Sequence, residues 1–518
     1  MTRINTNVPS LIAQSKLARS NGLVEQTLLR LSTGLRINRG ADDPAGLIVS
    51  ERLRSEIRGI EQGIKNSERA SSVIATTEGS LAEVSELLNS IKALTVEAAN
   101  SGAVSPEEIR ANQLQVDSAI DSITRIANTA SFAGLKLLNG SLAYSLSGVD
   151  TTAIPKTQVF GAQFGDRSSI DIDVEVIASA QTANLYLRSD FTVVPGGAGT
   201  VDGQLPSTVT FEIAGPRGVI ELTFPSTTTI DSIVTAINTR TSITGIRAAR
   251  NNAGNAASGL VFSSVDYGSE SFVSVKRLSG GAALQLGKID NDAPPPAAFI
   301  GGGANIVTAE RDTGRDVTAL VNGAVAGGRG LEVNVRNPEL DLNLTLGALF
   351  ATTVNGTPTS FTITGGGAKF QLGPQVTPLQ QTDIGIDSIA ATRLGGSLLL
   401  DDAGSLVLQF LSSLKSGNDN DLKSRNFENA SAILESAIDE VSTLRGRLGA
   451  FERNVLQTNV RSLEAGFENI TASTSVIRDA DFARETSELT RGQILVNAGT
   501  AVLAAANTNA QTVLQLLG

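Results

Sequence analysis

The stretch Leu-Ala-Glu-Val-Ser-Glu-Leu-Leu-Asn-Ser-Ile at residues 81–91 places apolar side chains three and four positions apart. The residues at this spacing are Leu81, Val84, Leu88 and Ile91. In a helix of 3.6 residues per turn they fall on one face. A stripe this narrow is typical of helices that pack in a coiled coil or bundle. The stretch therefore predicts a packed helix.

The same spacing extends outward from this stretch and returns near the other end of the chain. Before residues 81–91 the stripes are Ile4, Val8 and Leu11; Val24, Leu28, Leu31 and Leu35; and Leu53, Ile57, Ile60 and Ile64. After them comes the stripe of Val116, Ile120 and Ile123. The C-terminal stripes are Val441, Leu444, Leu448, Phe451 and Val455, then Leu456, Val460, Leu463, Phe467 and Ile470. Asp481 has the side chain expected of an N-cap, so a last helix is predicted from Phe482 to Leu516. Both chain ends are predicted to be helical.

Between about residues 141 and 380 the apolar period changes to two, which is typical of strands. Alternating residues at 209–213 and 220–224 flank Ala-Gly-Pro-Arg-Gly and predict a hairpin. Residues 331–335 and 340–346 also alternate, and residues 226–238 predict a short amphipathic helix. The expected fold is α+β. Both chain ends form elongated all-α coiled-coil or helical-bundle layers, and a β-rich domain is inserted between them.

Composition removes most catalytic and binding classes. The chain has 41 Lys+Arg against 52 Asp+Glu, a formal net charge of -11, so neither nucleic acid nor an anionic membrane is an expected partner. It contains no Cys and no His, which excludes disulfides, thiolate chemistry, a Ser-His-Asp triad and a His-based zinc site. The paired carboxylates Asp42-Asp43 and Asp401-Asp402 are expected in solvated loops. No catalytic, cofactor or metal site is predicted.

The two termini carry no membrane signal. Polar residues interrupt the first eight positions, so a cleaved signal peptide is not expected. Residues 492–518 contain no charged side chain, but their many amides disfavour membrane insertion. Such a segment is expected to face other helices or a polar channel. The simpler alternative is an ordinary buried helix.

Several blocks near the two ends resemble those of bacterial flagellins. They are Ile4-Asn5-Thr6-Asn7, residues 31–38 (LSTGLRIN), 41–47 (ADDPAGL), 478–485 (RDADFARE), 493–495 (QIL), 498–500 (AGT), 502–504 (VLA) and 513–517 (VLQLL). The resemblance covers about residues 1–140 and 395–518. In the middle, only Val317–Gly323 resembles, weakly, an internal flagellin repeat.

The resemblance implies a non-enzymatic subunit that polymerises into the flagellar filament outside the cell and serves swimming motility. It implies an inner helical layer of residues 1–43 and 471–518 that lines the export channel. Residues 44–175 and 395–470 would form a second helical layer with a β-hairpin element, and 176–394 a surface-exposed variable domain. The chain would be exported unfolded by the flagellar type III route.

The implied partners are many copies of the chain itself, the flagellar cap and hook–filament junction proteins, and an export chaperone at the C-terminal helix. The candidate assembly interface consists of Ile4, Val8, Leu11, Leu28, Leu31, Leu35, Arg36, Asn38, Asp42, Asp43, Asp479, Asp481, Phe482, Leu495, Val502, Leu503, Val513, Leu516 and Leu517. The alternatives are a hook–filament junction protein, another surface-exposed coiled-coil protein such as an adhesin, and an enzyme displayed on the filament.

Some flagellins are recognised by an innate immune receptor through the second layer, and residues 88–96 resemble the recognised segment. The candidate positions are Leu88, Ser90, Lys92 and Leu94. Lys92 and Leu94 fit the resemblance, but Ser90 stands where recognised members carry Arg, and Ala93 where they carry Glu. Weak or absent receptor activation is therefore expected.

Overall fold

The computed structural model describes residues 6–517 except 101, 166, 189–191, 194–202, 206, 254–257, 281–284, 290–305, 355 and 401–405, and it gives no side-chain surroundings for 188, 192–193, 400 and 509–517. The chain divides into two compact units. Unit 1 consists of Met1–Ser72, Phe370–Gln381 and Phe451–Gly518, and unit 2 of Val73–Lys369 and Thr382–Ala450. Each unit is described separately below.

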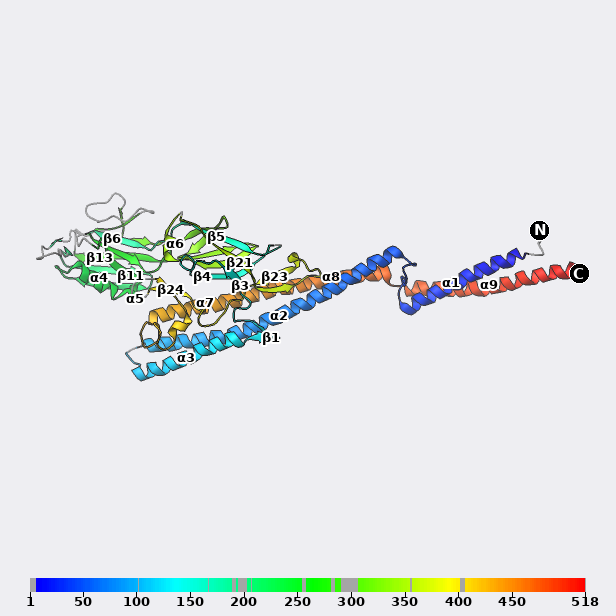
Figure 1. Ribbon diagram of the computed structural model, residues 1–518, viewed down its shortest axis with the longest axis horizontal. Coiled ribbons are helices and arrows are strands. Elements are labelled where there is room, and N and C mark those ends of the chain that lie inside the picture. The colour runs from blue at the N-terminus through cyan, green and yellow to red at the C-terminus, as the bar shows by residue number, and fades with distance from the viewer. Residues whose placement is uncertain are drawn as a thin grey trace. The chain divides into compact units, whose positions relative to one another are not determined.

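Long helices dominate the two ends of the chain (Figure 1). The helices are α1 (Val8–Thr33), α2 (Pro44–Ala99), α3 (Pro106–Thr129), α4 (Ile230–Asn238), α5 (Thr241–Thr244), α6 (Ala348–Thr352), α7 (Phe427–Phe451), α8 (Gln457–Arg478) and α9 (Phe482–Leu517). Short turns of other helix types are η1 (Pro378–Gln380), η2 (Leu411–Leu414) and η3 (Glu452–Leu456). None of the helices in the described part of the chain has the length and apolar character needed to cross a membrane.

In unit 1 the two terminal helices, α1 and α9, lie side by side and run in opposite directions (Figure 1). The Asn7 side chain donates to the Ala506 carbonyl at 3.0 Å at one end of the pair. At the other end, Arg30 meets Glu485. The pair buries little: only Ala13 and Thr27 of α1 are buried, and in α9, among the residues with described side-chain surroundings, only Glu485 and Gly492 are.

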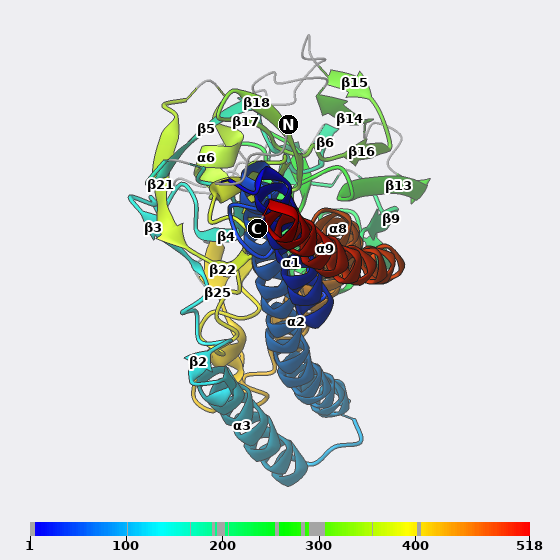
Figure 2. The same cartoon turned by 90° about the vertical axis from the view of Figure 1, so that its right-hand side faces the viewer.

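In unit 2 the predicted helical stripes form a packed core. Leu81, Val84, Leu88 and Ile91 of α2 and Val116, Ile120 and Ile123 of α3 are fully buried. Val441, Leu444 and Leu448 of α7 are buried too, and the Lys92 ammonium of α2 reaches Glu435 of α7 at 3.1 Å. Helix α3 lies beside α2 (Figure 2), and a capping box between Ser105 and Glu108 fixes its start. The predicted bundle is confirmed.

Unit 2 also holds most of the strands. The strands of the chain are β1 (Ser131–Phe132), β2 (Leu135–Lys136), β3 (Tyr144–Ser147), β4 (Lys156–Ala162), β5 (Ile170–Ala178), β6 (Asn184–Arg188), β7 (Thr192–Val193), β8 (Gly203–Gln204), β9 (Val209–Gly215), β10 (Gly218–Phe224), β11 (Ile246–Arg250), β12 (Leu260–Ser264), β13 (Phe272–Gly280), β14 (Gln285–Ile289), β15 (Ile306–Thr308), β16 (Arg311–Thr313), β17 (Thr318–Val321), β18 (Ala324–Arg329), β19 (Glu332–Arg336), β20 (Leu340–Thr345), β21 (Thr359–Gly366), β22 (Ala368–Gln371), β23 (Gln381–Ile384), β24 (Ser397–Leu400) and β25 (Leu406–Gln409).

The largest sheet of the described residues has the order β3-β21-β5-β17-β18-β19-β20-β4, with antiparallel neighbours throughout. The predicted alternation at 331–335 and 340–346 is confirmed, because β19 and β20 pair within it and bury Val333, Leu342 and Leu344. The hairpin from β17 to β18 turns at Asn322-Gly323, both with positive φ. Asn and Gly tolerate this conformation best.

Two further sheets share one apolar core with α4. Their orders are β10-β9-β13-β16 and β11-β12-β6-β14-β15. The predicted hairpin is β9–β10, in which Phe211 pairs with Leu222. The predicted helix at 226–238 begins only at Ile230, because the Thr229 side chain caps it by accepting the Ser232 N–H.

Candidate assembly site in the terminal helices

The segment between α1 and α2 is held by hydrogen bonds to a single carboxylate. Gly34 ends α1 in the left-handed conformation, at φ 70°. Asp42 then accepts the backbone N–H groups of Asn38 at 3.0 Å and Arg39 at 2.9 Å, and the Gln26 amide at 3.3 Å. The hydrogen bonds from Arg39 and Asn38 hold the pKa of Asp42 below its ordinary value. Asp42 thus stays ionised and closes the turn.

The next carboxylate, Asp43, starts helix α2. Its Oδ1 accepts the Gly46 N–H at 2.9 Å, and Pro44 occupies the first helical position, where no N–H is needed. A Cβ atom on Gly46 would lie 2.5 Å from Asp43 Oδ2 and 2.7 Å from Ile37 Cδ1. The motif Asp-Asp-Pro-Ala-Gly is therefore a turn followed by a helix cap.

The two chain ends meet directly at this turn. Leu35 and Asp479 form an antiparallel bridge, and the Arg36 N–H donates to the Arg478 carbonyl at 2.7 Å. On the other side, the Ala480 N–H donates to the Gly34 carbonyl at 2.9 Å. Residues more than 440 positions apart are thereby joined through the main chain. The direction in which α9 leaves α8 follows from this joint.

Asp481 begins α9, as the sequence predicts. Its Oδ1 accepts the N–H groups of Ala483 at 3.0 Å and Arg484 at 3.2 Å. These are donors that a helix start otherwise leaves without partners, and the negative charge also suits the N-terminal end of the helix dipole. The predicted end of α9 differs by one residue from the observed Leu517.

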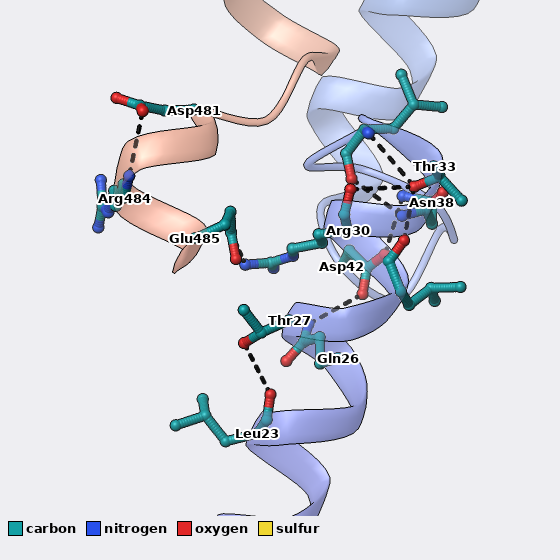
Figure 3. A network of polar contacts seen from close by, with 12 residues as sticks. Leu23, Gln26, Thr27, Arg30, Thr33, Asn38, Asp42, Asp481, Arg484 and Glu485 are labelled. Carbon is teal, nitrogen blue, oxygen red and sulfur yellow. Dashed lines mark hydrogen bonds and ion pairs between the residues drawn. The ribbon is translucent and has the colours of Figure 1, made fainter. Parts of the chain in front are cut away.

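An ion pair ties α9 back to α1 (Figure 3). Arg30 Nη1 lies 3.3 Å from Glu485 Oε1, and the Glu485 side chain is only 9% exposed. A carboxylate buried to this degree needs a charged or hydrogen-bonding partner. Arg30 supplies that partner from the last turn of α1, so the pair fixes the register of the two helices.

The same helices leave many large apolar side chains exposed. In unit 1 these are Val8, Leu11, Ile12, Leu28, Ile48, Val49, Val376, Leu379, Val476, Phe482, Ile494, Leu495 and Val502. Phe482 is 70% exposed and Val502 58%. Exposed apolar side chains in this number are typical of a surface that contacts another protein.

The structure brings only part of the predicted interface set together. Leu35 pairs with Asp479, Asn38 bonds Asp42, Arg36 donates to Ile477, and Asp43 and Asp481 each cap a helix. Leu31 and Leu503 are half-buried, whereas Val8, Leu11, Leu28, Phe482, Leu495 and Val502 are exposed. Ile4 lies outside the described residues, as do the side chains of Val513, Leu516 and Leu517.

Gln26, Arg30 and Glu485 also belong to this network, although they are not among the interface residues predicted from the sequence. Glu485 stands in the quoted block 478–485, one turn after the Asp481 cap. An acidic residue there, with a basic residue in the last turn of the other helix, could have suggested the pair.

The possible receptor segment lies on α2 in unit 2. Leu88 is fully buried and Lys92 is paired with Glu435. Ser90 and Ala93 are exposed, and Leu94 is half-buried. Only part of this segment is therefore accessible on the isolated subunit.

The fold and the terminal site together define a class of protein. Its two ends pair as helices around an inserted β-rich region, and the paired ends keep apolar surface open to further copies. These are the properties of a subunit of a helical polymer.

Comparison with protein families identifies the particular family. The model for the bacterial flagellin N-terminal helical region matches residues 4–143, and that for the C-terminal helical region matches 431–517. The flagellin of Aquifex aeolicus is 28% identical over 100% of this chain and 99% of its own length. A flagellin of Salmonella typhimurium is 26% identical over 99% of both chains. The chain belongs to the bacterial flagellin family and is a structural subunit of the flagellar filament, outside the cell.

One further family match falls in the middle region. The flagellin hook IN motif matches residues 208–266, which comprise β9, β10, α4, α5, β11 and β12. The segment Val317–Gly323, which weakly resembles an internal flagellin repeat, lies outside this motif. Flagellar hook-associated protein 3 of Legionella pneumophila is 13% identical, with a TM-score of 0.30 over 82% of this chain and 98% of that one. The full-length flagellin relatives do not favour the junction-protein alternative.

Proposed function

We propose that α1 and α9 form the inner layer of the filament and that neighbouring copies cover their exposed apolar side chains. The observation that carries this proposal is the exposure of Phe482, Ile494 and Val502 on a helix whose own partner, α1, leaves them uncovered. Neighbouring copies would bury these side chains at about 25 cal/mol per Å² of apolar surface.

Of the boundaries proposed for the layers, residues 43 and 395 lie in connections between elements, whereas 175 lies within β5 and 471 within α8. Residues 1–43 and 471–518 would line the export channel, and 44–175 and 395–470 would surround them. Residues 176–394 would face outward. Turns lie at or near the innermost boundary, since Asp42 and Asp43 separate α1 from α2 and residues 479–481 separate α8 from α9. The uncharged segment 492–518 suits a channel wall that should not bind charged cargo.

The terminal helices are expected to be marginal in the free subunit and to order on assembly. Ordering costs about 1–2 kcal/mol per residue in backbone entropy. A pair that buries as little as α1 and α9 cannot offset that cost alone, and isolated helices gain most of their stability from packing. Terminal helices with little stability of their own would also ease passage of the unfolded chain through the flagellar type III route.

The proposed partners beyond the chain itself are the flagellar cap, the hook–filament junction proteins and an export chaperone. An export chaperone would cover the apolar side chains of α9, such as Ile494 and Val502, before export. Cap and junction proteins would contact the same terminal helices at the two ends of the filament.

The test compares two valines that are both 58% exposed, Val502 on α9 and Val219 on β10. Purified Val502→Ser, Val219→Ser and unchanged subunits are mixed with filament seeds or a precipitating salt and viewed by electron microscopy. Long filaments from the unchanged and Val219→Ser subunits, with few or none from Val502→Ser, support the proposal. Equal filament yields from the two variants would contradict it.

Hydrogen exchange on the free subunit tests the ordering step. Amides of α1 and α9 should exchange quickly in the monomer and slowly in filaments, whereas α2 residues 81–91 should be protected in both. Strong protection of α1 and α9 in the monomer would contradict disorder before assembly.

A further inference from the structure

A cavity of about 390 Å³ lies inside unit 2, where β4, the segment after β23 and helix α7 meet. This volume is at the small end of pockets that hold small molecules, about 300–1,000 Å³. Strand β4 contributes Lys156 and Phe160, the segment after β23 contributes Asp387 and Arg393, and α7 contributes Glu440. Phe410, which follows β25, contributes as well, so the cavity is lined by four separate parts of the fold and contains four charged side chains.

Two of these charges already neutralise each other. The Lys156 ammonium donates to Glu440 Oε1, and it also donates to the Gly396 carbonyl at 3.2 Å. The second oxygen of Glu440 accepts the Gly395 N–H at 3.3 Å. Both side chains are mostly buried, with 15% and 16% exposed. Lys156 and Glu440 thus form an ion pair in which both side chains already have their partners.

The Asp387 carboxylate is not neutralised by an ion pair of this kind. Among the residues that the structure describes, none hydrogen-bonds to its carboxylate or forms an ion pair with it, and the residue is half-buried. Arg393 belongs to the same segment but is exposed. A partly desolvated carboxylate without a partner is stabilised by binding a cation or a proton.

The uncharged lining is part polar and part apolar. The polar residues are Thr157, Gln158, Ser388 and Thr392, and the apolar ones are Pro155, Phe160, Ile389, Leu394, Phe410, Val441 and Leu444. One face of the Phe160 ring is covered by the Arg447 guanidinium, whose Cζ lies 3.6 Å from the ring centroid. A ligand that satisfies both Asp387 and these walls needs a positive group attached to a small hydrocarbon body.

We propose that this cavity binds a small organic ammonium ion, with the ammonium on Asp387 and the hydrocarbon part against the apolar walls. A metal ion fits less well, because the second carboxylate is committed to Lys156 and the described residues contain no cluster of three His, Cys, Asp or Glu side chains that could hold one. The site is remote in sequence from the terminal helices and is independent of the polymerisation proposal.

Protons compete with such a ligand. Burial, followed by the nearby Glu440 carboxylate, raises the pKa of Asp387 to about 6, while Arg393 and Lys156 oppose the shift. Below that pH the carboxyl group is neutral and cannot pair with an ammonium. Affinity should fall about tenfold between pH 7.5 and pH 5, because only the ionised fraction binds.

The probe is benzylamine, which is an ammonium ion at pH 7.5, and its neutral analogue is benzyl alcohol. Binding to the full-length monomer is measured by isothermal titration calorimetry and by saturation-transfer NMR. A Kd on the order of a millimolar is expected for benzylamine, as is usual for a ligand of this size. Asp387→Asn keeps the side-chain shape and removes the charge, and the exposed Asp419→Asn is the matched control.

Binding of benzylamine that is lost in Asp387→Asn, kept in Asp419→Asn and weakened at pH 5 supports the proposal. The absence of benzylamine binding at pH 7.5 would overturn it. So would equal binding by Asp387→Asn, or equally strong binding of benzyl alcohol. The pH comparison uses the unchanged protein, so it does not depend on the folding of any variant.

Discussion

Gly492 of α9 lies against Val24 of α1 so closely that a Cβ atom at position 492 would be 2.8 Å from Val24 Cγ2. Seven residues further on, a Cβ at Gly499 would lie 3.3 Å from Leu17 Cδ1. Two glycines one heptad apart therefore set the close approach of the terminal helices. This approach is a property of the helix pair and not of either helix alone.

Replacing Gly492 by Ala should loosen this helix pair, whereas the same change at Gly22 should tighten it. Gly22 also lies in α1, but a Cβ there would meet no atom within 4 Å. Gly22→Ala should gain about 1 kcal/mol of helix propensity. At Gly492 the gain is opposed by the contact with Val24, whose β-branched side chain adjusts poorly. Hydrogen exchange in α1 and α9 of assembled filaments should slow for Gly22→Ala and quicken for Gly492→Ala; equal changes would refute the close contact.

Loss of Arg30 should destabilise the pairing of α1 with α9. Arg30→Gln leaves the buried Glu485 carboxylate without its ion pair, at an expected cost of about 1–3 kcal/mol. The temperature at which filaments dissociate should fall. In the double variant Arg30→Gln/Glu485→Gln, part of that loss should return. Arg54→Gln, which breaks an exposed pair with Glu51, serves as the control and should leave the dissociation temperature nearly unchanged.

The turn at Asn322 should tolerate Gly better than Val. Asn322 has φ 49°, and its side chain accepts the Asp173 N–H at 2.8 Å and donates to the Asp171 carbonyl at 3.0 Å. Asn322→Gly keeps the backbone conformation and loses these bonds, at an expected cost of about 1–2 kcal/mol. Asn322→Val adds strain from the positive φ and should cost more. Urea unfolding of the monomer followed by circular dichroism gives the order; a Val variant as stable as the Gly variant would contradict this account.

Stability of unit 2 should rise as the pH falls from 7.5 toward 5. Folding raises the pKa of Asp387 from an ordinary 3.8 to about 6, so the folded state binds the proton more tightly than the unfolded chain. The stabilisation is therefore complete below pH 4 and lost as the pH rises through 6, with a span of about 2–3 kcal/mol. Lowered pKa values at Asp117 and Asp316 act in the opposite sense at more acidic pH. Asp387→Asn should be more stable than the unchanged protein at pH 7.5. Its stability should change less between pH 7.5 and 5 in urea unfolding, and part of the change should remain because burial also raises the pKa of Glu440 and of Asp383.

Innate-receptor activation by the monomer should be weak and should increase when two side chains are restored. Ser90→Arg/Ala93→Glu supplies the residues that recognised flagellins carry, at two exposed positions of α2. A receptor reporter assay should show a stronger response to this variant than to the unchanged subunit. Asn89→Arg, an exposed position with the same added charge, should not reproduce it. A strong response to the unchanged subunit would show the prediction to be wrong.

The local pattern of apolar and polar residues was sufficient to predict most of the long helices and several strands. The stripe at 81–91 is the buried face of α2, the Asp481 cap starts α9, and the alternation at 209–213 and 220–224 is the hairpin β9–β10. Each of these follows from residues that are close together in the sequence. The blocks at the two ends also indicated the family.

The sequence by itself determined where helices and strands form and that the two ends act together, because helix and strand periods, caps and turns depend on neighbouring residues. Only the tertiary structure decided which face of α1 meets α9, and it placed Arg30 against Glu485, 455 positions away. It also decided that Asp387 shares a cavity with Lys156 and Glu440. Such contacts depend on how distant segments pack, and a one-dimensional pattern of apolar and polar residues does not specify that packing.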